Sequence, residues 1–143
     1  MSQVHIGIGI AVLASNGLAA AWGGVAWGRG EPSTVFWYLL RAAQAVVVAE
    51  AIVGTVLLLQ GRDAGDPLHY VYGIAPLVIS IVSEGARVGA AQAELRDVAD
   101  PNTLERREQV LLARRIVLRE IGVMTIGTIL IFTLALRAAA TGA

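Results

Sequence analysis

The two histidines of this chain, His5 and His69, each stand at the start of an apolar run. A neutral imidazole binds metals through one ring nitrogen, and two imidazoles on facing helices can ligate haem iron from both sides. Two histidines alone do not make a closed zinc site, which needs four protein ligands. The pattern therefore leaves three hypotheses open: a haem-ligand pair, two unrelated interfacial histidines, or a metal site assisted by Asp63 or Asp66.

An acidic residue, Glu50, interrupts a second apolar run near its middle. It lies about nine residues from the expected water boundary on either side, which is roughly 14 Å at 1.5 Å per residue. A charge at that depth in a membrane costs at least about 2.5–3.5 kcal/mol. We therefore expect Glu50 to be protonated and hydrogen-bonded to residues at similar depth, such as Asn16 and Ser80, or to serve as the coupling carboxylate of a proton relay or transporter.

Arg41 and Gln44 lie in the same run as Glu50, nearer its N-terminal end. They are one helical turn apart and so share a helix face. Arg41 is expected to extend toward water or to pair with Glu84 or Glu120. Together with Glu50, Asn16 and Ser80, these two residues form the expected set of intramembrane polar side chains.

The elements that must position these residues are membrane helices. The 143-residue chain is 56% hydrophobic and 15% charged, with a mean hydropathy of +0.67, whereas soluble domains carry about 25% charged residues. It contains no cysteine, which excludes disulfides, thiolate metal sites and iron–sulfur clusters. About 20 apolar residues span a bilayer as a helix. The pattern predicts one all-α domain, a four-helix transmembrane bundle with spans at 4–27, 35–60, 67–88 and 115–138.

Arginine counts predict the orientation of this bundle. Nine arginines flank the spans on one side, and only Arg62 and Arg137 lie on the other. Basic residues favour the cytoplasmic side, so both termini are expected outside, in a multi-pass protein of a bacterial inner membrane. The connection 89–114 is expected to be cytoplasmic and helical, with Asp100 as N-cap and Pro101 opening a helix that continues into the fourth span. Its charged surface is either a solvated face or a docking surface for a cytoplasmic partner or anionic lipid.

The stretch LRAAQAVVVAEAIVGTVLLLQGRDAGDPLHYVYG resembles part of the haem A synthase family, and VHIGIGIAVLA resembles the helix that supplies that family's first histidine. In the family an Arg and a Gln open a helix, a Gly follows, and an outer loop leads to a ligand histidine. The resemblance implies that His5 and His69 bind a b-type haem at the outer side, where Arg62 and Arg137 would be in reach of its propionates. It covers about the first 85 residues.

The chain also departs from that family. Haem A synthases are twice this size, with two four-helix halves, and they place a carboxylate and an Arg beside the first histidine, where this chain has Val4 and Ile6. The family's hydroxylating chemistry is therefore not implied. A single haem-holding half remains, which is also similar to small four-helix membrane proteins of actinobacteria that accompany respiratory oxidases.

Three functions follow from these observations. The first is a small accessory membrane subunit of a respiratory or electron-transfer assembly, binding b-type haem and having no catalytic activity of its own. The second is a purely structural or assembly protein without cofactor, and the third is a dimeric proton-coupled transporter using Glu50. The expected partners are the lipid bilayer and other membrane subunits or a second copy, and nucleic acid is not among them.

Overall fold

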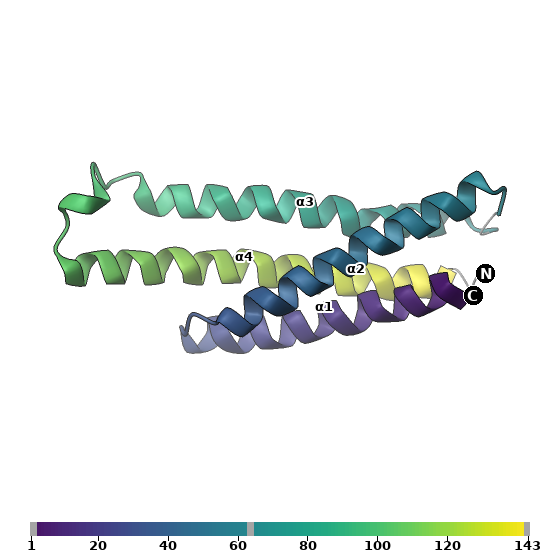
Figure 1. The fold of residues 1–143 in the computed structure, drawn as a ribbon, viewed down its shortest axis with the longest axis horizontal. Helices are drawn as coiled ribbons and strands as arrows, with labels where there is room; N and C mark the ends of the chain where they lie inside the picture. Colours follow the sequence, from purple (N-terminus) through teal and green to yellow (C-terminus); the bar gives the residue numbers. More distant parts are fainter. Residues whose placement is uncertain (1–2, 63–64, 142–143) are drawn as a thin grey trace.

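Four long α-helices make up the fold in the computed structural model, which describes residues 3–62 and 65–141. They are α1 (Gln3–Arg29), α2 (Thr34–Leu59), α3 (Pro67–Leu95) and α4 (Arg106–Thr141), joined by short turns (Figure 1). Each is long and apolar enough to cross a membrane. The predicted all-α, four-helix bundle is therefore confirmed, and the chain has the architecture of a multi-pass membrane protein.

Local sequence signals set the helix ends. Ser33 caps α2 by accepting a hydrogen bond from the backbone N–H of Phe36, and Asp66 caps α3 in the same way from Leu68. Gly30 and Gly61 follow α1 and α2 with positive φ angles of 64° and 73°. This left-handed conformation ends helices and costs glycine nothing, because glycine has no Cβ.

The connection between α3 and α4 agrees with the expectation at its start and differs in its middle. Helix α3 continues to Leu95, seven residues beyond the predicted span, as expected of a helical connection. Asp100 and Pro101 do open a helical turn, but it is a single 3-10 turn (Pro101–Thr103) and not the start of α4. Leu104 is extended, so α4 begins only at Arg106. The prediction of one continuous helix from Pro101 is thus wrong at this point.

The bundle has two distinct ends (Figure 1). At the histidine end, α1 begins, α4 ends and the 60–66 loop joins α2 to α3. At the hairpin end, α3 and α4 project beyond the turn between α1 and α2. Helix α4 packs along both α1 and α3, α1 also packs on α2, and α2 has few contacts with α3 or α4. Helices α1 and α3 therefore lie diagonally across the bundle.

Small residues bring the helices together in the hairpin half of the bundle. At Gly23 on α1, an added Cβ would lie 2.5 Å from Cε2 of Phe36 and would also collide with the Thr125 hydroxyl. At Gly122 on α4, it would lie 2.8 Å from the Trp27 ring. Close approach of this kind is the usual means of packing helices in lipid, where apolar burial supplies no driving force between them.

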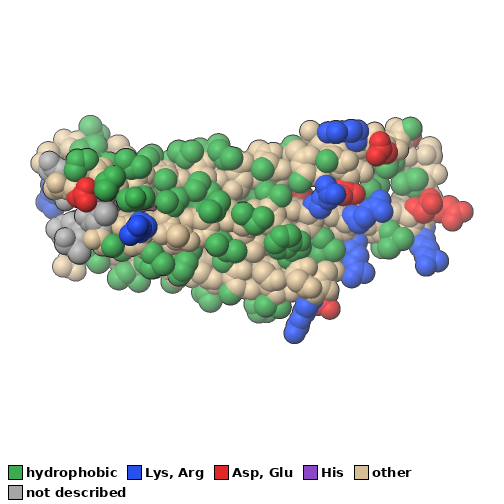
Figure 2. All heavy atoms as spheres, turned by 180° about the vertical axis from the view of Figure 1, so that it is seen from behind, with side chains coloured by type: hydrophobic (Ala, Val, Ile, Leu, Met, Phe, Trp, Pro, Cys, Tyr) green, Lys and Arg blue, Asp and Glu red, His purple; other side chains and the backbone are tan. Residues whose placement is uncertain are grey.

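The surface has the distribution expected of a membrane protein. Hydrophobic side chains cover most of the length of the bundle, whereas charged side chains gather at the hairpin end (Figure 2). Many large apolar residues are at least half exposed, among them Ile10, Leu18, Ile52, Ile81 and Val82. An exposed apolar surface this extensive is unusual for a soluble monomer and suits contact with lipid.

Candidate functional site at the histidine end

His5 and His69 meet across the diagonal of the bundle. Their ring centroids are 5.9 Å apart and the ring planes are inclined by 75°. His5 lies in the first turn of α1 and His69 in the first turn of α3. Because both helices run in the same direction, their first turns lie at the same end of the bundle. The structure therefore brings the two histidines together.

Glu50 of α2 also reaches this site. Its Oε1 atom lies 3.0 Å from Nδ1 of His5, and the two side chains are only 19% and 12% exposed. The contact lies off the direction of an N–H bond on Nδ1, so Nδ1 of His5 has no well-directed hydrogen bond within the described residues. The other carboxyl oxygen, Oε2 of Glu50, is also buried without a hydrogen-bond partner among them. The pair is therefore an electrostatic contact that a small rotation of the imidazole would convert into a hydrogen bond.

The second imidazole is held in a similar way. Nδ1 of His69 lies 3.2 Å from the backbone carbonyl oxygen of Ala138 on α4. A carbonyl can only accept, so this contact favours the tautomer with the proton on Nδ1. If Glu50 is ionised, it favours the same tautomer for His5, because a carboxylate can only accept a hydrogen bond. Each imidazole then keeps Nε2 as the basic nitrogen, the arrangement that metal-ligating histidines usually have.

Glycines at one fixed spacing follow these side chains. Each of His5, Glu50 and His69 is followed four residues later by a glycine, namely Gly9, Gly54 and Gly73. Residues four apart share a helix face. A Cβ on Gly9 would lie 3.4 Å from Oε1 of Glu50, and a Cβ on Gly54 would lie 3.8 Å from Cε1 of His5.

The antiparallel helices α1 and α2 thus accommodate each other's polar side chain reciprocally. Gly9 of α1 faces Glu50 of α2, and Gly54 of α2 faces His5 of α1. Gly73 has no neighbour within 4 Å of the position of a Cβ and faces open space. The repeated spacing is a sequence signal that would have identified these glycines as part of the site.

A cavity of about 290 Å³ adjoins the three polar side chains. It is lined by residues of all four helices, with mostly apolar walls: Ile6, Gly9, Ile10, Val12, Leu13, Val47, Tyr72, Gly73, Pro76, Ala135, Ala138 and Ala139, besides His5, Glu50 and His69. Ligand pockets have volumes of about 300–1,000 Å³, so this cavity is at the lower limit. Its chemistry is that of an apolar chamber with two imidazoles and one carboxyl group.

Several residues expected near the site lie elsewhere. Asn16 is buried but its side chain donates to the carbonyl of Val12 on its own helix, so Glu50 has His5 as its neighbour and not the expected Asn16. Ser80, Arg62 and Arg137 do not line the cavity.

The acidic residues of the 60–66 loop were a further expectation. Asp66 serves as the N-cap of α3, accepting from the N–H of Leu68 at 2.8 Å. Asp63 lies outside the described residues. Among the described residues, no three of His, Cys, Asp and Glu are placed to hold one metal ion together. A carboxylate-assisted site for a bare metal ion thus has no geometric support here.

A second polar cluster lies in the hairpin half of the bundle. Glu84 of α3 accepts hydrogen bonds from Arg41 and from Gln44, the latter at 2.8 Å, and Arg87 bridges Glu84 and Glu120 with contacts of 2.8 Å each. The structure thus pairs Arg41 with Glu84, one of its two expected partners, whereas Glu120 pairs with Arg87. Two positive and two negative groups balance, and they tie α2, α3 and α4 together.

No protein-family model matches this chain, and no curated protein or solved structure matches it either. The site is therefore interpreted from its own geometry.

Proposed function

We propose that the chain is a small integral membrane subunit that holds one b-type haem between His5 and His69 and carries electrons within a membrane assembly. The observation that supports this proposal best is the pair of imidazoles from diagonal helices, each with Nδ1 beside an acceptor. Bound haem would supply a one-electron redox centre. The chain's own residues would supply two imidazole nitrogens to hold it and a chamber with mostly apolar walls.

The distance between the imidazoles supports a shared metal. An imidazole nitrogen bonds a first-row metal at about 2.0–2.1 Å and lies roughly 1.2 Å from the ring centre, so two rings in line across one ion have centroids about 6.4 Å apart. The observed separation of 5.9 Å is close to this value. Rotation about the Cα–Cβ bonds or a small shift of α1 against α3 would supply the difference, and rotation about the Cβ–Cγ bonds, which is soft for histidine, would turn the ring nitrogens toward one another.

The number of ligands favours haem over a bare ion. A bare ion would find two imidazoles, and Glu50 lies on Nδ1 of His5, where it would act on the histidine and not on the metal. A metal that brings its own equatorial ligands needs only two more. The cavity is smaller than most ligand pockets, so we expect the histidine end to open further on binding. Arg62 and Arg137 remain the predicted partners of the propionates.

The charge distribution supports an orientation. Nine arginines lie at the hairpin end, and Arg62 and Arg137 lie at the histidine end. By the preference of basic residues for the cytoplasm, the hairpin end faces the cytoplasm and the haem site lies near the outer face of a bacterial cell membrane. We assign no catalytic residue, and we expect other membrane subunits or a second copy as partners.

An absorption spectrum tests the proposal directly. Protein expressed with a haem precursor and purified in detergent should show the Soret band of a low-spin, bis-imidazole haem. The variants His5→Ala and His69→Ala should lose that spectrum. Val4→Ala and Leu68→Ala, at exposed positions next to the histidines, serve as matched controls and should retain it. A colourless wild-type protein, or a spectrum unchanged in both histidine variants, would refute the proposal.

Two alternatives remain distinguishable. A proton-coupled transporter would show flux in proteoliposomes that is lost in Glu50→Gln, and the unpaired Oε2 of Glu50 is the feature that favours it. A purely structural protein would bind no haem, and Glu50→Gln would change neither flux nor assembly. Measuring both flux and spectrum on the same preparations separates the three functions.

A further inference from the structure

Three arginines of α4 lie at the hairpin end, level with the turn between α1 and α2 or close to it. Arg114 reaches back to the turn between α1 and α2, where Nη2 and Nε lie 2.8 and 3.3 Å from the Gly30 carbonyl oxygen. Arg115 and Arg119 follow on the same helix, and both contact Glu94 of α3, at 3.4 and 2.6 Å. Their side chains are 64% and 59% exposed.

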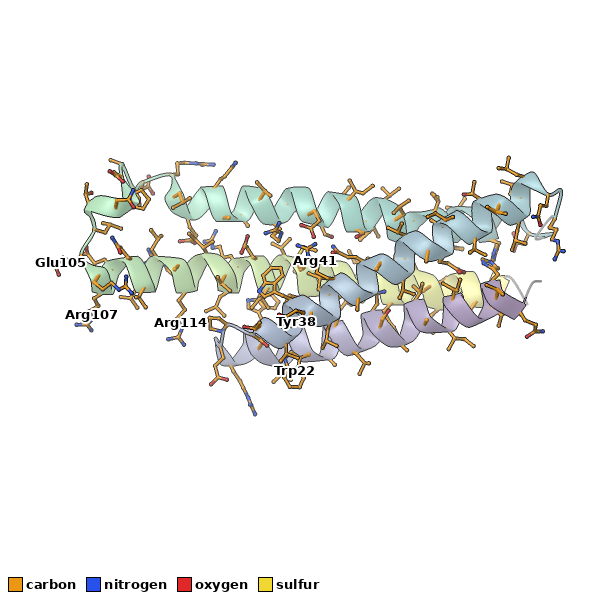
Figure 3. All side chains as sticks on the ribbon, in the orientation of Figure 1. Trp22, Tyr38, Arg41, Glu105, Arg107 and Arg114 are labelled. Carbon is orange, nitrogen blue, oxygen red and sulfur yellow. The ribbon has the colours of Figure 1, made fainter. Side chains whose placement is uncertain are left out.

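Aromatic residues identify that depth. Trp22, Trp27 and Tyr38 are about half exposed or more and lie near the turn between α1 and α2 (Figure 3). Exposed Trp and Tyr rings prefer the boundary between hydrocarbon and headgroups. The Trp27 ring packs over Gly122. Arg119 and Arg115 precede Gly122 by three and seven residues, so they lie about 4–11 Å nearer the hairpin tip at 1.5 Å per residue. Lipid phosphates lie at this height.

The local charges at this depth favour an anion. Arg114 is bound to a neutral carbonyl, and Arg115 and Arg119 share the single carboxylate of Glu94, so these groups carry a net positive charge. The turn adds one further residue of each sign, Arg29 and Glu31, and leaves that balance unchanged.

The other acids of the hairpin lie further out. Asp100, Glu105 and Glu108 lie toward its tip, and Glu105 and Arg107 project well beyond the turn between α1 and α2 (Figure 3). Asp97 lies two residues past the end of α3, where Arg96 next to it in the chain balances its charge. Positive charge therefore dominates at headgroup height, and the compensating negative charge lies beyond it, in water.

We propose that Arg115 and Arg119 bind the phosphate of an anionic phospholipid in the adjacent leaflet, while Arg114 stays bound to the Gly30 carbonyl. The planar guanidinium group presents forked donors that match phosphate oxygens, and two exposed forks one turn apart on α4 can hold one headgroup. The Glu94 carboxylate holds both side chains on the same face of α4 and competes with a lipid phosphate for them. The site is separate from the histidine end and stands whether or not haem binds there.

Lipid retention tests this site. The protein is purified from equal mixtures of phosphatidylglycerol and phosphatidylcholine, and the lipids that remain bound are counted by native mass spectrometry. Wild type should retain phosphatidylglycerol preferentially. The double variant Arg115→Gln/Arg119→Gln should lose that preference by roughly 30-fold, because each arginine at an anionic surface contributes a factor of about five.

Two further variants make the test specific. Arg106→Gln/Arg107→Gln removes the same charge at the hairpin tip and should leave the preference unchanged. Glu94→Gln removes the carboxylate that competes with phosphate for Arg115 and Arg119, so the preference for phosphatidylglycerol should become stronger. An unchanged preference in Arg115→Gln/Arg119→Gln, an equal loss in the tip variant, or displacement of the lipid by millimolar inorganic phosphate would overturn the assignment.

Discussion

Replacing Glu50 by leucine should weaken haem binding without destabilising the apoprotein. Leucine keeps most of the side-chain volume but removes the acceptor that lies 3.0 Å from Nδ1 of His5. Loss of such an outer partner typically weakens metal binding by about 10–100-fold, which corresponds to roughly 1.4–2.7 kcal/mol. Glu50→Gln keeps an oxygen at the same place and should cost less than about tenfold.

The stability of the apoprotein should respond differently. Oε2 of Glu50 is buried without a hydrogen bond among the described residues, and such a group costs about 1–3 kcal/mol. Glu50→Leu removes that cost, and Nδ1 of His5, which also lacks a well-directed hydrogen bond, is left in much the same condition. The removed cost has no new cost against it, so the apoprotein should be as stable as wild type or more stable, by up to about 1–3 kcal/mol.

The assay has two parts that must agree. Haem is titrated into apoprotein in detergent while the Soret absorbance is followed, and apoprotein unfolding is followed by circular dichroism. Thr55→Val, an exposed change on the same helix, is the control and should alter neither quantity. Wild-type haem affinity in Glu50→Leu would refute the role given to Glu50. A loss of stability as large as the loss of affinity would show that its role is structural instead.

Three further predictions concern packing and charge. Gly23→Ala should destabilise the bundle by about 2 kcal/mol, since it overpacks against the Phe36 ring, whereas Gly24→Ala, which meets no atom within 4 Å, should be neutral or stabilising; thermal unfolding in detergent measures both. Gly73→Leu should fill the open space beside His69 and abolish the Soret band while both ligands remain, and a retained spectrum would exclude this cavity as the cofactor site. Arg87→Gln should cost about 2 kcal/mol, less than a fully buried pair, because it removes the ion-pair partner of Glu120 and leaves Glu84 with Arg41 and Gln44 alone; a midpoint of unfolding within 1 °C of wild type would contradict this.

Hydropathy was sufficient to predict the helices but not their mutual rotation. The second span was predicted at 35–60 and observed at Thr34–Leu59, because lipid requires a continuous apolar helix of that length. Proximity of His5 to His69 was one hypothesis among others, since both lie in a first turn, where burial periodicity says least. Whether they would meet depended on the packing of α1 and α3 against α4.

The partners of the site residues were harder to predict. Glu50 was expected to contact Asn16 at similar depth, but it lies against His5 and beside Gly9, and Asn16 bonds to its own helix. Nδ1 of His69 faces the backbone carbonyl of Ala138. Every residue has a backbone carbonyl, so residue types could not predict this contact. The sequence contained one unused signal, the glycine four residues after each polar residue of the site.

Helix α1 is closely packed at Gly23, whereas its first turns border the cavity, so a small tilt of α1 about Gly23 moves mainly the His5 end. Eighteen residues separate Gly23 from His5, which is about 27 Å of helix. A tilt of roughly 5° about Gly23 therefore displaces the His5 end by about 2 Å, while the ion pairs between α2, α3 and α4 stay in place. Widening the chamber in this way needs no helix to unwind. A bulky ligand can then enter sideways between α1 and its neighbours, from the hydrocarbon and not from water.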